Sequence, residues 1–304
     1  DLLQVKTAII ACLDAFAETG REVPICVSVT IEQQGTMLVG SDIAAVATTV
    51  EPFPVFSLGL NCATGPADME SHIRYLSRFW PRRISCIPNQ GLPQVVNGQT
   101  CYPLSPGEYA RHMANFVTHN GVSIVGGCCG TSPTHIRELV NAVSDLTPAK
   151  RDVRPPAAVS SLYQSVDLVQ DPPPLLIGER ANPNGSKKFR ECLLADDFDG
   201  CLRIGLDQEA GGAQVLDLCA AYAGRDEHHD LLELQRRYVS SVKLPLVIDS
   251  TTPECIMQCL RRYPGRCMVN SINLEDGGAN LHRNCSNIKR YGAAVIALTI
   301  NEKG

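Results

Sequence analysis

Short apolar runs alternate along this chain with longer amphipathic stretches, and that alternation limits the possible fold more than any other feature. Helical patterns occupy, for example, residues 68–80, 106–119, 227–242 and 252–262. Strands that alternate with helices form βαβ units around a parallel sheet, so the pattern predicts an α/β protein. Runs typical of buried strands lie at residues 23–31, 55–60, 83–87, 122–125, 175–178, 214–218, 244–249, 268–272 and 293–300.

A proline-rich stretch without clear periodicity divides these strands into two groups, and we predict a linker at residues 151–173. A closed (β/α)8 barrel needs eight strand–helix units in about 250 residues. Four predicted strands precede the linker and five follow it. We therefore predict two TIM-type barrels, each partly present: the C-terminal half of one in residues 1–150 and the N-terminal half of another in residues 174–304. A doubly wound sheet is the alternative, but no G-x-G-x-x-G or P-loop motif follows a strand.

The composition fits a globular protein and excludes several classes of function. The 304 residues are 44% hydrophobic and 19% charged, with a net charge of −5. The absence of a basic run argues against a nucleic-acid partner, and no apolar run reaches the roughly 18 residues of a membrane span. Without a secretory leader, we expect a cytoplasmic protein that contacts no membrane. The chain starts at Asp1 inside a helical pattern, so we expect a piece of a longer protein.

Fourteen cysteines are many for a chain of this kind. A disulfide scaffold is the weaker explanation in a chain that lacks a signal peptide. We expect most of these cysteines to act as small buried apolar side chains. Those that fall in apolar helical or strand patterns are Cys12, Cys26, Cys192, Cys255 and Cys259.

Three cysteines differ from the rest because each directly follows a predicted strand. Cys62 follows one strand, and Cys128 and Cys129 follow another. The C-terminal ends of parallel barrel strands share one rim, so the three thiols should converge there. Adjacent Cα atoms are about 3.8 Å apart, below the usual disulfide range of about 4.4–6.8 Å, so Cys128 and Cys129 are poor disulfide partners. Three thiolates with one open position are typical of a catalytic zinc site.

The first half resembles the zinc-dependent homocysteine S-methyltransferase family through the motifs GLNCATGP, PNQGLP and VGGCCGTSPTHI. The resemblance implies that Cys62, Cys128 and Cys129 hold zinc and form the catalytic centre, where the homocysteine sulfur binds as a nucleophilic thiolate. It also implies that Asn61 and Asn89 orient the amino acid, although each could instead be a turn former. The family's N-terminal motif, rich in glycine and acidic residues, is absent, which we interpret as truncation.

The second half resembles the pterin-binding domain of the cobalamin-dependent methionine synthase family. The motifs are LLIGERANPNGSKKFRE, AQVLDLCAA, LPLVIDSTTPE, CMVNSINLEDG and YGAAVIALTINEKG. A buried pterin ring needs partners for its amide edge and exocyclic amine, and Asp and Asn at strand ends supply them. A rim carboxylate could also cap a helix, and Asp249 followed by Ser250 is the clearest case. The folate-binding residues that the resemblance implies are Glu179, Asn182, Asp217, Asp249, Asn270 and Asn301.

Two positions of the second half depart from the commonest pattern of this family. Cys219 stands where many relatives have asparagine, and Asn301 stands where many have aspartate. A thiol cannot replace the two hydrogen-bonding groups of an amide. One pterin contact is therefore expected to be weakened at Cys219, while Asn301 can still form hydrogen bonds but supplies no charge.

The cobalamin-binding signature Asp-x-His-x-x-Gly is missing. Asp226 and His228 come nearest, but Leu231 stands in place of the glycine, and the surrounding charges predict a helix start. We therefore expect cobalamin to be bound by a module beyond Gly304.

The resemblance implies a methyltransferase that moves a methyl group from 5-methyltetrahydrofolate through cobalamin to zinc-bound homocysteine. The products would be methionine and tetrahydrofolate. The alternatives are a cobalamin-independent zinc homocysteine methyltransferase fused to another barrel, and a non-catalytic zinc or thiol redox module.

Overall fold

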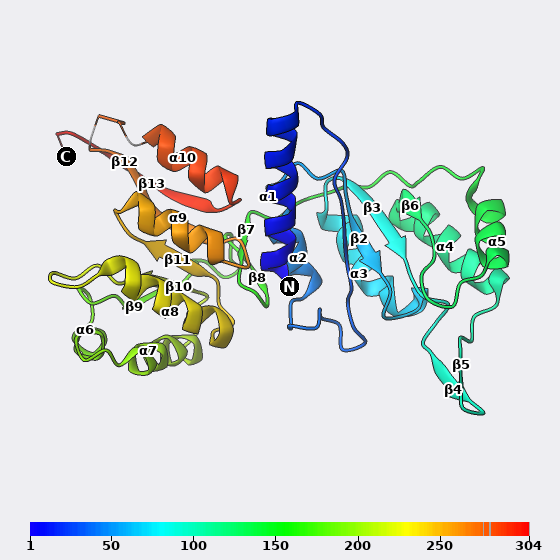
Figure 1. The fold of residues 1–304 in the computed structure, drawn as a ribbon, viewed down its shortest axis with the longest axis horizontal. Helices are drawn as coiled ribbons and strands as arrows, with labels where there is room; N and C mark the ends of the chain where they lie inside the picture. The colour runs from blue at the N-terminus through cyan, green and yellow to red at the C-terminus, as the bar shows by residue number, and fades with distance from the viewer. Residues whose placement is uncertain (276, 280, 304) are drawn as a thin grey trace. The chain divides into compact units, whose positions relative to one another are not determined.

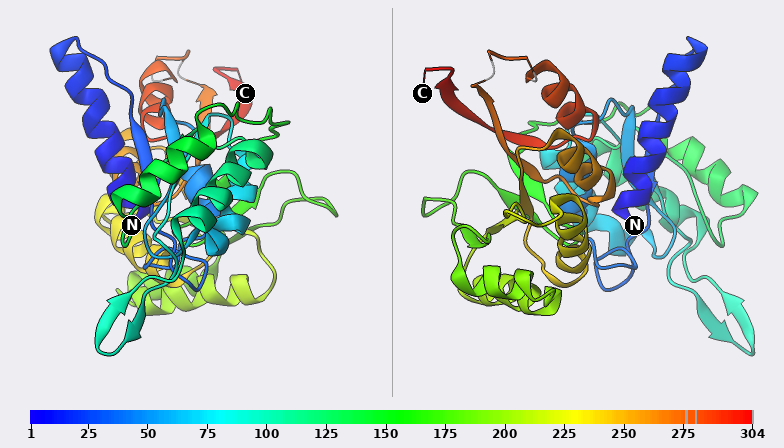
Figure 2. Two further views of the ribbon diagram at one scale, coloured as in Figure 1. Left: turned by 90° about the vertical axis from the view of Figure 1, so that its right-hand side faces the viewer. Right: turned by 60° about the vertical axis from the view of Figure 1, so that its left-hand side comes forward.

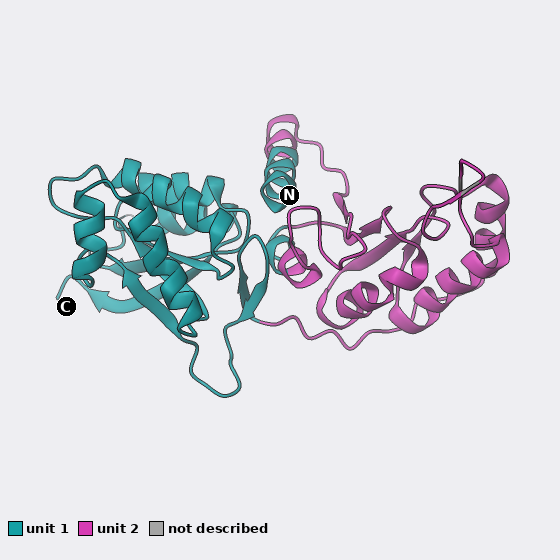
Figure 3. Ribbon diagram, turned by 90° about the horizontal axis from the view of Figure 1, so that it is seen from below, with its two compact units in different colours: residues 1–13, 48–53, 157–304 teal, residues 14–47, 54–156 magenta. Residues whose placement is uncertain are grey.

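The structure, a computed structural model, describes residues 1–275, 277–279 and 281–303, which form two compact units (Figure 3). The first unit, drawn magenta and labelled unit 2 in Figure 3, comprises residues 14–47 and 54–156. The second unit, drawn teal and labelled unit 1, comprises residues 1–13, 48–53 and 157–304. Helices α1 (Leu2–Thr19) and α2 (Ile43–Val50) therefore contribute residues to both units.

The first unit is built on a four-stranded parallel sheet in the order β1-β2-β3-β6. A short antiparallel hairpin, β4 (Gln94–Val96) with β5 (Gln99–Cys101), separates β3 from β6 in the chain (Figure 1). The strands are β1 (Cys26–Val29), β2 (Ser57–Asn61), β3 (Arg83–Ile87) and β6 (Ile124–Val125), and the helices between or after them are α3 (Pro66–Phe79), α4 (Pro106–Asn120) and α5 (Pro133–Val143).

The second unit is built on a five-stranded parallel sheet in the order β9-β10-β11-β12-β13. Its strands are β9 (Ile177–Ala181), β10 (Val215–Cys219), β11 (Leu246–Asp249), β12 (Met268–Leu274) and β13 (Ala294–Asn301). Its helices are α6 (Lys187–Leu194), α7 (Phe198–Ala210), α8 (Glu227–Ser241), α9 (Pro253–Arg262) and α10 (Leu281–Arg290), which cover one face of the sheet (Figures 1 and 2).

Strand order distinguishes the two predicted architectures. A doubly wound sheet reverses its strand order at a switch point, whereas a barrel adds each new parallel strand beside the previous one. Both sheets advance in sequence order without reversal among the described residues. This order confirms the prediction of partial (β/α)8 barrels and argues against the doubly wound alternative.

Alternation along the strands separates a helix-facing layer from a barrel interior in the second unit. Leu216 and Leu218 point outward and pack in the main core with helix residues such as Leu234. Val215 points to the other side, where it packs with Val247, Met268 and Val159. Because side chains alternate along a strand, Asp217 and Cys219 share the inner side with Val215. The apolar cluster thus packs on the same side of the sheet as Asp217 and Cys219, below them along the strands.

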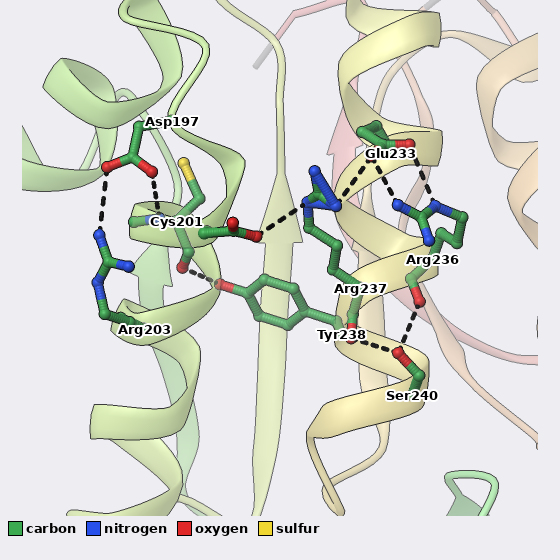
Figure 4. A network of polar contacts seen from close by, with 10 residues as sticks. Asp197, Cys201, Arg203, Glu233, Arg236, Arg237, Tyr238 and Ser240 are labelled. Carbon is green, nitrogen blue, oxygen red and sulfur yellow. Dashed lines mark hydrogen bonds and ion pairs between the residues drawn. The ribbon is translucent and has the colours of Figure 1, made fainter.

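Polar contacts lock α7 against α8 in the outer layer (Figure 4). The fully buried Tyr238 donates a hydrogen bond to the carbonyl oxygen of Cys201 at 2.7 Å. Gly205 leaves room for this ring, since a Cβ there would overlap it. At the surface, Glu233 of α8 pairs with Arg236 and Arg237.

The predicted linker contains ordered structure. Strands β7 (Ala158–Ser160) and β8 (Ser165–Asp167) form an antiparallel hairpin, and the Val159 side chain is fully buried. Arg151 donates hydrogen bonds to the carbonyl oxygens of Trp80 and Arg82 at 2.7 and 2.6 Å. The domain limits at residues 150 and 174 remain a prediction.

Most predicted strands and helices are present with ends shifted by a few residues. The burial predicted for Cys12 and Cys26 is wrong, because both are exposed, while Cys255 and Cys259 are buried as expected. Cys26 opens β1 on an uncovered side, and apolar neighbours in the sequence could not show that. Among the described residues, no helix has the length and apolar character needed to cross a membrane.

Candidate functional site

Cys62, Cys128 and Cys129 come together beyond the ends of β2 and β6, as predicted from their strand positions. The Sγ atom of Cys129 lies 3.7 Å from that of Cys62 and 3.9 Å from that of Cys128. The three Sγ atoms lie within 4.8 Å of one another, and all three cysteines are free. A disulfide would need about 2.05 Å between two sulfurs. The cluster is therefore a set of three separate thiols that could hold a metal ion.

The last residue of β3 and the first residue of the loop after it connect the two cysteine-bearing loops through backbone atoms. The amide of Cys62 donates to the carbonyl of Ile87 at 3.1 Å, and the amide of Cys128 donates to the carbonyl of Pro88 at 2.9 Å. Tyr109 of α4 donates from its hydroxyl to the same Pro88 carbonyl and to that of Gly126. These hydrogen bonds, which the sequence did not reveal, position the cysteine loops through backbone atoms and the Tyr109 hydroxyl and do not involve the thiol groups.

Asn89 lies against the thiol cluster, whereas Asn61 is held by β1. The Oδ1 atom of Asn89 accepts a hydrogen bond from the amide of Cys129 at 3.0 Å. The amide of Asn61 accepts from Ser28 at 2.6 Å and donates to Thr30 at 3.4 Å. Homocysteine binding by these two asparagines remains a prediction.

Electrostatics at the thiols favours unequal protonation. A hydrogen bond from the Ala63 amide, reinforced by the neighbouring thiols, lowers the pKa of Cys62. Burial, followed by the interaction with Cys62, raises the pKa of Cys128 to about 11. The first thiolate formed in such a cluster makes the next more costly unless a cation joins it.

Tyr102, which sequence analysis did not single out, stands beside this cluster. Its ring packs over Gly130, where a Cβ would lie 2.5 Å from the ring carbons. Gly130 also has φ +79°, a conformation that disfavours other residues. The Tyr102 hydroxyl interacts with the side chain of Cys129. Gly130 thus leaves the space in which the Tyr102 ring packs beside the thiol cluster.

A second constellation lies on the inner side of the second sheet. Strand register pairs Cys219 with Asp249, and Asp249 with Asn270. These three residues form one row across β10, β11 and β12, and we call it the rim row. Asp217 lies one layer deeper and is 6% exposed, and its carboxylate interacts with Asn270.

Crowding of acidic groups changes the ionisation of this site. Burial first, then the charges of Asp249 and Glu179, raises the pKa of Asp217 to about 7. Burial also raises the pKa of Asp249, while the Cys219 thiol beside it acts in the opposite direction. Near neutral pH, Asp217 can therefore serve as a hydrogen-bond donor or acceptor for a buried polar ligand.

The remaining predicted folate residues are placed unequally. Asn182 donates to Asp249 at 3.5 Å, so it lies beside the rim row. Glu179 is exposed on β9 but is close enough to affect both aspartates. Asn301 is exposed at the end of β13, and its amide oxygen accepts from the backbone of Lys303 at 3.0 Å. This hydrogen bond of Asn301 is thus local, between residues two positions apart.

Helix capping does not account for Asp249, which corrects the alternative weighed from the sequence. The N-cap of α9 is Thr252, and the Ser250 hydroxyl accepts a hydrogen bond from the Thr252 amide. The charges at Asp226 do begin a helix, as predicted, because Asp226 caps α8 by accepting from the His229 amide.

Family comparisons follow the division of the chain into two parts. Residues 1–143 match the family described as homocysteine S-methyltransferase. Residues 178–304 match the family described as pterin binding enzyme.

Two curated proteins are similar over the whole chain. Methionine synthase of Mycobacterium tuberculosis (strain ATCC 25618 / H37Rv) is 45% identical, and methionine synthase of Mycobacterium leprae (strain TN) is 44% identical. The chain spans 26% of the length of each. Among solved structures, the carboxyl transferase domain of Rhizobium etli pyruvate carboxylase with pyruvate covers 98% of this chain and 52% of its own at 10% identity. Its TM-score of 0.26 is too low to support a likeness.

Proposed function

We propose that this chain, whose residues 1–143 match the homocysteine S-methyltransferase family and whose residues 178–304 match the pterin binding enzymes, is the substrate-binding portion of a cobalamin-dependent methionine synthase. The full protein would transfer a methyl group from 5-methyltetrahydrofolate, by way of cobalamin, to homocysteine. The products would be methionine and tetrahydrofolate. The thiol cluster is the observation that carries this proposal most directly.

The spacing of the three sulfurs suits zinc. Zinc binds thiolate sulfur at about 2.3 Å, so two sulfurs at a tetrahedral centre lie about 3.8 Å apart. The distances from the Cys129 sulfur to those of Cys62 and Cys128, 3.7 and 3.9 Å, bracket that value. Cys62, Cys128 and Cys129 would thus hold zinc and leave a fourth position for the homocysteine sulfur. Zinc, when bound, supplies the Lewis acidity that keeps this sulfur deprotonated near neutral pH.

The residues around the cluster would orient the amino acid. Asn89 and Asn61 are proposed to bind homocysteine, with Asn89 the better placed because it already contacts the Cys129 backbone. Tyr102 would shield one side of the site, since its ring lies over Gly130. Partial exclusion of water by this ring would strengthen the electrostatic interactions of a thiolate at the site.

The second unit would bind the pterin ring of methyltetrahydrofolate. The rim row presents a thiol, a carboxylate and an amide at one level, with Asp217 below it. Carboxylates accept hydrogen bonds from the amide N–H and exocyclic amine of a pterin, and an asparagine can both donate and accept. We propose Glu179, Asn182, Asp217, Asp249, Asn270 and Asn301 as the folate-binding residues.

Cobalamin would be carried by a module of the same full-length protein. We propose a domain at residues 1–150 for homocysteine, a linker at 151–173 and a domain at 174–304 for folate. We also propose a cytoplasmic location, where both substrates would be available.

The proposal is tested by assaying the full-length protein with homocysteine and 5-methyltetrahydrofolate in the presence and absence of cobalamin. We expect methionine formation that requires both cobalamin and zinc. Activity without cobalamin would instead favour the fused cobalamin-independent enzyme. Stoichiometric zinc without methyl transfer under any condition would favour a redox module.

A further inference from the structure

Glu227, to which neither sequence analysis nor the proposed function assigned a role, joins two loops at the folate site. It is the first residue of α8 and therefore follows the loop after β10. Its Oε1 atom accepts a hydrogen bond from the Ser250 hydroxyl at 2.5 Å, and its Oε2 atom accepts from the Thr252 hydroxyl at 3.0 Å. Ser250 directly follows Asp249, so the bridge begins one residue from the rim row.

The α8 end of this bridge is firmly held. Asp226 caps the helix by accepting from the amide of His229 at 3.1 Å. Arg225 binds both carboxylate oxygens of Asp230, at 2.7 and 2.8 Å. Asp230 is 1% exposed, and a bidentate arginine–carboxylate pair has fixed geometry. Glu227 therefore projects from a rigid helix start.

The β11 end uses hydroxyls that would otherwise serve the helix. Thr252 is the N-cap of α9, yet its side chain makes no cap hydrogen bond. A threonine in that position commonly satisfies a helix amide, whereas here it donates to Glu227. Ser250 is 3% exposed, donates to Glu227 and accepts from the Thr252 amide. Both hydroxyls of this turn are thus directed at one carboxylate.

We propose that Glu227 is a positioning residue of the folate site, which ties the loop after β11 to α8 and so fixes Asp249 in the rim row. This inference rests on the proposed function. It adds a residue outside the pterin-contacting set and assigns it the role of aligning the carboxylate that receives the ring. Without the tie, the turn that follows Asp249 would lose both side-chain contacts to α8.

Glu227 also acts on Asp249 through its charge. The acidic groups that face Asp249 are Glu227 and Glu179, with Asp217 one layer below, and the thiol of Cys219 lies beside it. The negative charge of Glu227 contributes to the raised pKa of Asp249. Removing that charge should let Asp249 ionise at lower pH.

The test measures binding of 5-methyltetrahydrofolate to the full-length protein as a function of pH for Glu227→Ala, Glu227→Gln and Glu233→Ala. Glu227→Ala should weaken binding about tenfold, the effect of losing a hydrogen bond to a charged group. Glu227→Gln can still accept from Ser250 and can donate to Thr252, so its affinity at neutral pH should stay within about threefold of wild type. In the plot of folate affinity against pH, the fall in affinity on the acid side (the acid limb) should move to lower pH for Glu227→Gln. Glu233 serves as the control because it pairs with arginines on the outer face of α8 (Figure 4).

A second route to the same loss is the double variant Ser250→Ala with Thr252→Val, which removes both donors and leaves Glu227 in place. It should weaken folate binding as much as Glu227→Ala does. Wild-type affinity in Glu227→Ala, or an unshifted acid limb in Glu227→Gln together with full affinity in the double variant, would overturn the assignment. Failure of the wild-type protein to bind folate would instead contradict the proposed function.

Discussion

The two candidate sites hold their functional atoms in different ways. The thiols lie in loops beyond β2 and β6, and Cys62 even adopts a positive φ of 59°. The rim row lies within strands, and the register of the sheet spaces its members. Strand β3 lies between β2 and β6 in the sheet, so the backbones of β2 and β6 are two strand spacings of about 4.8 Å apart. The loops beyond these strands let the Cys62 and Cys129 sulfurs approach to 3.7 Å. Loops thus suit the convergence that a metal needs, whereas strands suit the flat edge of a planar ring.

The largest effect should come from breaking the loop-built site. Cys129→Ala removes the sulfur that lies within 4 Å of each of the other two, so zinc should be lost and homocysteine methylation abolished, because two thiolates leave a metal site incomplete. Zinc content and methionine formation would be measured, with the exposed Cys12→Ala as a control that changes neither. If the variant keeps one zinc per chain and full activity, the cluster is not the catalytic centre.

At the site built on strands, the measurable effect should be a change in folding stability, because the buried Asp217 charge destabilises the folded state. The pKa of Asp217 rises from 3.8 to about 7, so the native state favours the protonated form. Below pH 4 both states are protonated and burial of Asp217 has little electrostatic cost. As pH rises through 7 the cost grows to its full value.

Asp217→Asn should therefore stabilise the protein by up to about 4 kcal/mol above pH 7, from 1.36 kcal/mol per pKa unit, and by little at pH 4. Urea unfolding at both pH values measures the difference. A gain of the same size at both pH values would show that ionisation of Asp217 is not the cause. Folate binding should weaken in the same variant, as expected when function keeps a destabilising charge.

Much of the fold could be predicted because the apolar pattern and the helix signals agree. The motif Ser-Pro-x-Glu at residues 105–108 begins α4 with a capping box, and Gly121 ends it with a left-handed residue. The hairpins β4–β5 and β7–β8 escaped prediction because three-residue strands are too short for a periodic signal. For this reason the sequence did not reveal that Val159 of β7 packs in the apolar cluster of the barrel interior.

The candidate sites were predictable where each functional residue lies at, or just beyond, the C-terminal end of a strand. Cys62 directly follows β2, Cys128 lies three residues after β6, and Asp249 is the last residue of β11. Contacts with backbone atoms far away in the sequence could not be predicted. An example is the Pro88 carbonyl, which accepts hydrogen bonds from the Cys128 amide and the Tyr109 hydroxyl. Glu227 was read only as part of a charged helix start, because its partners are 23 and 25 positions away.

A test of independence between the two sites comes next in size. Asp249→Ala should slow methyl transfer from methyltetrahydrofolate to cobalamin about 10- to 100-fold, the effect of losing hydrogen bonds to a charged group. Transfer from methylcobalamin to homocysteine should stay near wild type, because the thiol cluster and the rim row lie on different sheets. The two half-reactions would be assayed separately. Equal loss in both would mean that the sites are not separate.

The smallest effect should come from Cys219, the member of the rim row that departs from the commonest pattern of the family it resembles. Cys219 is 5% exposed, shares the inner side with Asp217 and lies beside the Asp249 carboxylate. Asparagine there can donate to Asp249 as the thiol does and can also offer an amide to the pterin. Cys219→Asn should leave folate affinity unchanged or improve it by about 0.5–1.5 kcal/mol, one hydrogen bond. Asp217→Ala should weaken binding more, because a buried donor of the pterin loses its acceptor.

Fluorescence titration with 5-methyltetrahydrofolate would compare these two variants with Cys219→Ala, which removes the thiol without adding an amide. Affinity should fall in the order Cys219→Asn, Cys219→Ala, Asp217→Ala, because the first variant adds an amide, the second loses only a weakly hydrogen-bonding thiol, and the third loses a buried carboxylate. If Cys219→Asn binds folate more weakly than Asp217→Ala, the thiol is more than a weak substitute for an amide. The strand-built site would then depend on the size of the Cys219 side chain as well as on its register with Asp249.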